Sequence, residues 1–164
     1  MKLLGKECRY LPVIDLRPAE MLALEQLPQK DKEMMLPLFQ LRPWVASNSL
    51  ESSTARLQSA FGKGRAFLKI ADSAPVISRR DVHDELDKLR SHEGGYANWV
   101  RFFESDANSN FIPCIQLANP EGVEVQVKRM LDLGRGALIH IVRSAFPYVD
   151  AIISVIKRAS KSGG

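Results

Sequence analysis

Five short runs of consecutive apolar residues constrain the fold of this chain more than any other feature of its sequence. They occupy residues 11–16, 36–41, 66–71, 111–117 and 137–142. Each run is too short for an ordinary helix, and continuous apolarity without alternation is typical of a strand that is covered on both faces. Several runs also contain the β-branched and aromatic residues that strands favour. The runs therefore predict five buried strands that lie parallel to one another.

Amphipathic helical patterns separate these runs. The clearest begins at residue 50, where inward-facing positions recur at steps of four, three and four residues up to Phe61. Ser47, Asn48 or Ser49 can cap the start of this helix, and Gly62 can end it. Further helices are predicted over residues 18–27, 79–93, 96–104, 120–133 and 146–161. The chain thus alternates strands and helices.

This alternation predicts an α/β fold with parallel strands in about five repeated strand–helix units. Right-handed crossovers leave two architectures, an open doubly wound sheet or neighbouring strands that form part of a TIM-type barrel. We expect a partial, TIM-barrel-like arrangement over residues 1–164, either as a single domain or as the N-terminal part of a larger barrel. Five units of an eight-unit barrel would leave strand edges unpaired.

The composition is that of a globular protein. Of 164 residues, 45% are hydrophobic and 26% are charged, which suffices for one core, and two cysteines cannot form a disulfide framework. The first residues lack the apolar run of a secretion signal, and no stretch is long enough to cross a bilayer, so we expect a cytoplasmic protein with no membrane partner. The net charge of +4 is mild. Nucleic-acid binding through the basic residues 157–161 is therefore only one alternative.

Polar residues follow the predicted strands at the end where α/β folds place their ligands. Arginine and lysine side chains that converge there could hold a phosphate or a carboxylate, because guanidinium groups match such anions bidentately. The simpler alternative is that these cations pair with Asp15 and Asp72 and solvate the strand ends. The candidate ligand-binding residues are Asp15, Arg17, Arg42, Lys69, His140 and Arg143.

Lys69 and His140 stand out because each lies within an apolar run. Lys69 near Asp15 would form a buried ion pair or, with a lowered pKa, serve as a base or Schiff-base amine. His140 would be a hydrogen-bonded core residue or a general base. The structural role is the simpler one for both. No histidine, cysteine or carboxylate pattern has the spacing of a metal site, so we expect neither a metal nor a cofactor.

Two segments carry a family resemblance. Residues 10–27 read YLPVIDLRPAEMLALEQL, and residues 35–44 read MLPLFQLRPW. The "Y-x-P" strand, the helix before "L-P" and the "P-L-F-x-x-x-P-W" strand resemble the start of the beta family of phage and prophage proteins. The likeness continues through residues 111–117, which read FIPCIQL.

The resemblance implies a barrel-like fold, usually in a chain about twice as long, and a role in conflict between phages and their hosts or rivals. The resemblance implies a basic residue at the end of the first strand and an acid at the end of the third. The sequence departs from this pattern, because Asp15 is followed by Arg17 at the first strand end and Lys69 precedes Asp72 at the third. Two functions stay open. The protein binds a protein partner or a second copy through an open sheet edge, or it is an enzyme or binding protein for a phosphorylated or nucleotide-like ligand.

Overall fold

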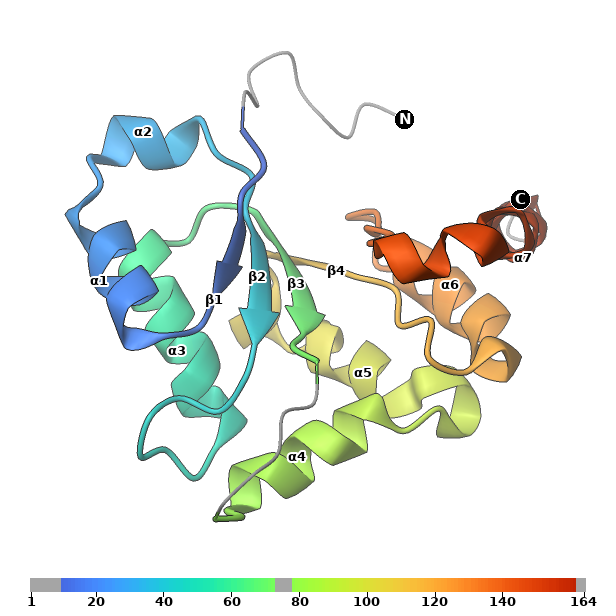
Figure 1. Ribbon diagram of the computed structural model, residues 1–164, viewed down its shortest axis with the longest axis horizontal. Coiled ribbons are helices and arrows are strands. Elements are labelled where there is room, and N and C mark those ends of the chain that lie inside the picture. The colour runs from blue at the N-terminus through green and yellow to red at the C-terminus, as the bar shows by residue number, and fades with distance from the viewer. Residues whose placement is uncertain (1–9, 73–77, 162–164) are drawn as a thin grey trace. The chain divides into compact units, whose positions relative to one another are not determined.

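The computed structural model describes residues 10–72 and 78–161 of the protein. The chain divides into two compact units, Met1–Lys88 and Leu89–Gly164, and strands alternate with helices along the chain (Figure 1). Wherever strands pair within a unit, the pairing is parallel. The predicted α/β class with parallel strands joined by helices is therefore confirmed. Closure into a barrel stays a prediction, as does the single domain.

Unit 1 contains three parallel strands in sequence order. They are β1 (Val13–Asp15), β2 (Leu38–Leu41) and β3 (Ala66–Ile70), and β1 lies at the edge of the sheet. The register pairs Val13 with Leu38 and Leu38 with Phe67. Side chains of one such row lie on the same face of the sheet, because neighbouring strands are pleated in phase. The register therefore fixes which polar side chains become neighbours at the strand ends.

Two longer helices of unit 1 pack beside each other, α1 (Pro18–Gln26) and α3 (Leu50–Phe61). Phe61 of α3 meets Phe39 of β2 edge to face, with ring centroids 5.5 Å apart. Ser49 caps α3 as predicted, because its side chain accepts a hydrogen bond from Ser52 N. The sequence analysis missed α2 (Gln29–Glu33), whose five residues are polar and too few to show a helical period.

Helix α4 (Asp81–Arg90) begins two residues later than predicted. The imidazole Nδ1 of His83 accepts a hydrogen bond from Arg80 N at 3.0 Å and so satisfies the backbone ahead of the first turn. Glu85 of α4 accepts a bond from Leu50 N at 2.7 Å, and Arg80 donates to Ser47 O at 2.6 Å. These bonds join α4 to the start of α3 within unit 1.

Unit 2 is mainly helical. It contains α5 (Glu93–Glu104), β4 (Phe111–Pro113), α6 (Val123–Asp132) and α7 (Val149–Lys161), with short 3-10 turns η1 (Asp106–Asn108), η2 (Pro120–Gly122) and η3 (Arg143–Tyr148). Trp99 and Phe103 are fully buried and pack edge to face, so both belong to the core of unit 2. Asn119 caps the start of η2, because its side chain accepts a hydrogen bond from Glu121 N. Leu131 of α6 is exposed.

One arginine connects three parts of unit 2. Arg135 donates hydrogen bonds to the carbonyl oxygens of Phe103, Asn108 and Phe111, at 2.5, 3.1 and 3.2 Å. These carbonyls belong to the end of α5, to η1 and to the first residue of β4. Backbone carbonyls near helix ends lack helical partners, so a guanidinium is well suited to satisfy several of them at once.

The fifth predicted strand is much shorter than its apolar run. Within the described residues, the run 137–142 forms a single parallel bridge, between Leu138 and Cys114. Leu138 N donates to Pro113 O, and Ile115 N donates to Leu138 O, both at 2.8 Å. Ile139 and Val142 are 37% and 46% exposed. The prediction of a long buried strand here is wrong, because among the residues that the structure describes this run pairs only through that one bridge.

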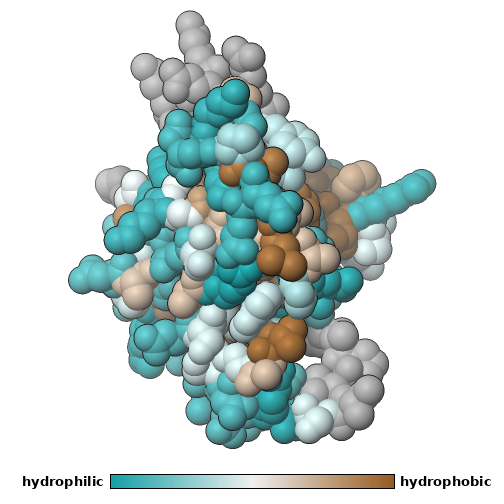
Figure 2. Space-filling view, turned by 90° about the vertical axis from the view of Figure 1, so that its left-hand side faces the viewer, coloured by the Kyte–Doolittle hydropathy of each residue, from teal (hydrophilic) through white to brown (hydrophobic). Residues whose placement is uncertain are grey.

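The face viewed in Figure 2 is mostly hydrophilic, with separate apolar spots between polar side chains. Scattered exposed apolar residues of this kind are normal for a globular surface. None of the helices in the described part of the chain has the length and apolarity needed to cross a membrane.

Candidate functional site

A row of polar side chains crosses the three strands of unit 1 at their carboxyl ends. Asp15 is in register with Gln40, and Gln40 is in register with Lys69. Phe39 packs against α3, so alternation along the strand places its neighbour Gln40 on the opposite face. The row therefore lies on the face that points away from α3.

Asp15 is the centre of this strand-end cluster, which we define as Asp15, Arg17, Gln40, Arg42 and Lys69. Both carboxylate oxygens of Asp15 lie 2.9 Å from Nη2 of Arg42. Nε of Arg17 lies 3.0 Å from Asp15 Oδ2. The Asp15 side chain is only 14% exposed, whereas that of Arg17 is 60% exposed. One partly buried carboxylate thus holds two guanidinium groups at the end of β1.

Several donors of the cluster are unused. Arg42 Nε is buried, and no hydrogen-bond partner for it exists among the described residues. Lys69 Nζ lies 3.7 Å from Asp72, whose side chain is 91% exposed, so this ion pair is weak. Lys69 therefore pairs with Asp72, and Asp15 pairs with the two arginines. With Glu20, whose carboxylate accepts a hydrogen bond from Asp15 N, three carboxylates lie near the three cations, and the Lys69 ammonium is the most weakly paired of these cations.

The structure brings four of the six predicted site residues to one strand end. Asp15, Arg17 and Arg42 are in direct contact, and Lys69 belongs to the same row. His140 and Arg143 lie in unit 2, where His140 is half-buried and Arg143 is exposed at the start of η3. Their assignment to the ligand site stays a prediction.

The sequence analysis overlooked Glu20. Its carboxylate accepts a hydrogen bond from the backbone N–H of Asp15, so α1 folds back onto the end of β1. Glu20 lies in the first turn of α1, where an acid also interacts favourably with the helix dipole, and its sequence position gives no sign of the bond to Asp15. Glu20 thus helps to fix the backbone that carries the central carboxylate.

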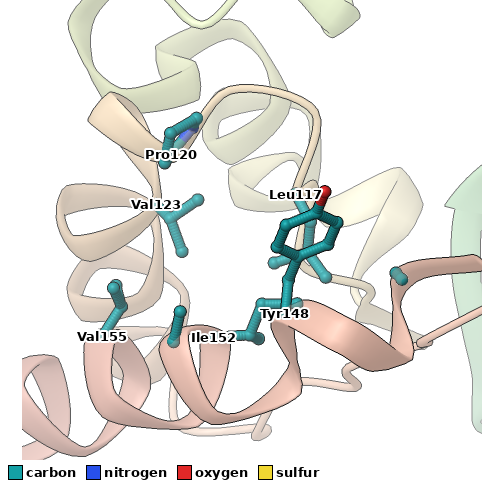
Figure 3. A pocket seen from close by; sticks show the side chains of 8 residues that line it. Leu117, Pro120, Val123, Tyr148, Ile152 and Val155 are labelled. Carbon is teal, nitrogen blue, oxygen red and sulfur yellow. The ribbon is translucent and has the colours of Figure 1, made fainter.

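Unit 2 contains an apolar groove of about 340 Å³. Tyr148, Ile152 and Val155 project from η3 and α7 into this groove, which Pro120 of η2 and Val123 of α6 line on the other side (Figure 3). The remaining lining residues are Leu117, Ala145 and Ala151. Among the lining side chains only Tyr148 carries a polar atom, so this groove does not suit a phosphorylated ligand.

A second hollow in unit 2 is polar but balanced in charge. Arg101, Glu104, Arg129 and Asp132 line it between α5 and α6. Arg129 also donates to Gly94 O at 3.1 Å. Two carboxylates offset its two cations, so this hollow offers no excess of positive charge to an anion. In residues 10–72 and 78–161, histidine, cysteine and carboxylate side chains form no group of three that could hold a metal ion.

These observations define an α/β protein with parallel strands and a cationic cluster at the strand carboxyl ends. The sequence profile described as "Beta protein" matches residues 10–162. The chain belongs to this family. It is 26% identical to "Protein beta" of Enterobacteria phage P4, in an alignment that covers 88% of this chain and 39% of that protein. The chain therefore spans about two fifths of the length of this relative. No solved structure matches the chain.

Proposed function

We propose that this beta-family protein binds a phosphorylated, anionic ligand at the strand-end cluster. The observation that carries the proposal is the in-register placement of Asp15 and Lys69 on one face, with Arg42 and Arg17 held at the same strand end. Parallel α/β folds place ligands at the carboxyl ends of their strands. A phosphate group would accept hydrogen bonds from the guanidinium groups and from the weakly paired Lys69 ammonium.

Isothermal titration with inorganic pyrophosphate tests this function. Lys69→Met keeps the length of the side chain and removes a cation whose present partner is an exposed carboxylate. Because a hydrogen bond to a charged group contributes about 1.5 to 3 kcal/mol, we expect K69M to weaken pyrophosphate binding at least tenfold. Binding should also weaken as salt is added.

Lys63→Met is the matched control. Lys63 is exposed and precedes β3, so it lies toward the opposite end of this strand from Lys69. The substitution makes the same change of charge in the same unit, and K63M should bind pyrophosphate like the unmodified protein. Equal affinity of K69M and the unmodified protein would contradict the proposed function.

A second candidate function is action in phage–host or inter-phage conflict through a protein partner. It is favoured by the relative from phage P4 and by the exposed edge of β1, where Leu11 and Val13 are 41% and 52% exposed. Plating efficiency of phages on cells that express the protein tests it. Protection that is lost in V13P but kept in K69M would support partner binding, whereas the reverse result would support the ligand site.

A further inference from the structure

Gln40 lies at the centre of the strand-end cluster. β2 is flanked by β1 and β3 in the sheet (Figure 1), and the register places Gln40 between Asp15 and Lys69 on one face. Neighbouring strands lie about 4.8 Å apart, so a ligand held at Lys69 is within reach of Gln40. The side chain of Gln40 is half-buried. A ligand that binds at this row therefore meets a neutral amide beside the cations.

The amide of Gln40 makes no hydrogen bond within the part of the chain that the structure describes. Gln126, which is fully buried in unit 2, shows the usual behaviour of such a group. Its Oε1 accepts a bond from Gln116 N at 2.7 Å, and its Nε2 donates to Gln116 O at 3.1 Å. The half-buried amide of Gln40 instead keeps an acceptor oxygen and two N–H donors for a ligand.

The charged neighbours of Gln40 suit an anion but do not recognise a neutral group. Arg42 holds the Asp15 carboxylate, and the Lys69 ammonium lies 3.7 Å from Asp72. These cations attract a phosphate through charge-assisted hydrogen bonds. An uncharged amide adds little to that attraction, and it pairs best with a group that both donates and accepts, such as a hydroxyl. The cluster thus combines groups for an anion with one group for a neutral polar substituent.

A nucleobase is another neutral group that an amide can recognise, but this face of the sheet offers no open ring for stacking. Strands β1, β2 and β3 place one aromatic side chain on the face of the row, Phe67, and it is only 5% exposed. Trp44 follows β2, but its ring lies 5.2 Å from the guanidinium of Arg56 in α3. Because proteins commonly bind single bases by stacking them on aromatic side chains, a hydroxyl fits this face better.

We infer that Gln40 is a specificity-determining residue that recognises a hydroxyl group beside the phosphate, so that the ligand is a phosphorylated polyol of the sugar-phosphate class. This inference rests on the proposed function, because the cluster has to hold the phosphate. The phosphate accepts hydrogen bonds from Lys69 and the arginines. A hydroxyl on the carbon chain next to the phosphate ester then donates to Gln40 Oε1 or accepts from Nε2.

Two phosphate monoesters with the same carbon skeleton test this assignment. Glycerol 1-phosphate and propyl phosphate differ only in the hydroxyl groups of the former. In isothermal titration, we expect the unmodified protein to bind glycerol 1-phosphate about two- to tenfold more tightly, which is the range of one neutral hydrogen bond. Gln40→Met keeps the length of the side chain and removes the amide. Q40M should therefore bind both esters with the affinity of propyl phosphate, and it should bind pyrophosphate like the unmodified protein.

Gln29→Met is the matched control. Gln29 is exposed on α2, where its amide donates to Glu33 at 3.1 Å, so Q29M should keep the preference for glycerol 1-phosphate. Equal affinity of the unmodified protein for the two esters, or a preference that persists in Q40M, would overturn the inference. Pyrophosphate binding that still weakens in K69M would then leave the proposed function standing. If neither ester binds and K69M does not affect pyrophosphate binding, the proposed function is refuted and the inference with it.

Ribose 5-phosphate and adenosine monophosphate distinguish the two sources of a sugar hydroxyl next to a phosphate. Since the row offers a base no ring to stack on, we expect adenosine monophosphate to bind no more tightly than ribose 5-phosphate. Tighter binding of adenosine monophosphate would overturn the assignment to the sugar-phosphate class, because it would show that the site also recognises a base.

Discussion

Asp15→Asn should change stability and ligand affinity in opposite directions. The substitution removes the charge that holds Arg42 through two contacts of 2.9 Å and Arg17 through one of 3.0 Å. Hydrogen bonds to charged groups contribute about 1.5 to 3 kcal/mol, and an exposed ion pair such as that with Arg17 contributes about 0.2 to 1 kcal/mol. We therefore expect the free energy of unfolding to fall by about 2 to 4 kcal/mol.

The same change should strengthen pyrophosphate binding. Asp15 competes with an anionic ligand for the two guanidinium groups, and it repels that ligand directly. The repulsion between the Asp15 carboxylate and pyrophosphate is about 1 to 1.5 kcal/mol at an effective dielectric constant between that of a protein surface and that of water. Its loss in D15N corresponds to about tenfold tighter binding. The loss of stability in D15N is measured separately, by urea unfolding followed by circular dichroism. The midpoint of this transition should fall by about 1 to 2 M.

Glu33→Gln is the control for D15N. Glu33 is exposed at the end of α2, where its carboxylate accepts only a surface bond from Gln29, at 3.1 Å. The variant makes the same change of net charge, so E33Q should leave stability and pyrophosphate affinity close to those of the unmodified protein. Weaker binding by D15N would refute the reasoning, because it would show that the carboxylate itself contacts the ligand or that the ligand binds elsewhere.

Three further predictions concern the rest of the chain. Arg135→Met should lower the stability of unit 2 by about 2 to 4 kcal/mol, because three carbonyl oxygens lose a charged donor; hydrogen exchange of the β4 amides measures this loss. Gly95→Ala should lower the midpoint of thermal unfolding far more than Gly134→Ala. Both glycines have a φ of +70°, so the backbone cost of the substitution is similar. A Cβ at position 95 would lie 2.5 Å from Val125, whereas a Cβ at position 134 meets no atom within 4 Å. The hydrogen bond from Arg56 lowers the pKa of Glu25 below 4.5, so this pair stabilises the fold above that pH and its contribution is lost as the pH falls through the lowered pKa. In R56Q the pKa of Glu25, followed by carbon NMR, should rise toward its ordinary value, and an unchanged pKa would refute the pairing.

The apolar runs predicted the strands well where both sides of a strand are covered. Phe39 and Leu68 lie in the interiors of β2 and β3 and are fully buried, as continuous apolarity indicates. The run 137–142 has the same composition but forms one bridge, because strand formation needs a neighbour that the run itself does not encode. Helix α2 escaped prediction for the opposite reason, since its residues are all polar.

The candidate site was predictable only within one unit. Parallel strands bring their carboxyl ends together, and this rule correctly gathered Asp15, Arg17 and Arg42. The rule does not decide which partner a long side chain reaches. Lys69 meets Asp72, three residues further along the chain, because the register places Gln40 of β2 between Lys69 and Asp15. Register, which sequence patterns do not reveal, determined this outcome.

The carboxylate of Glu20 has a consequence for solubility. Fibrils grow when an exposed strand offers an uninterrupted ladder to one incoming chain after another. Here α1 supplies an acid that occupies the N–H of Asp15, and the turn at Arg17 occupies the C=O. The stretch of β1 whose backbone can pair with another strand is thereby limited to a few residues. Within the described residues, the stretch of β1 before Asp15 is therefore too short to pair with one incoming chain after another.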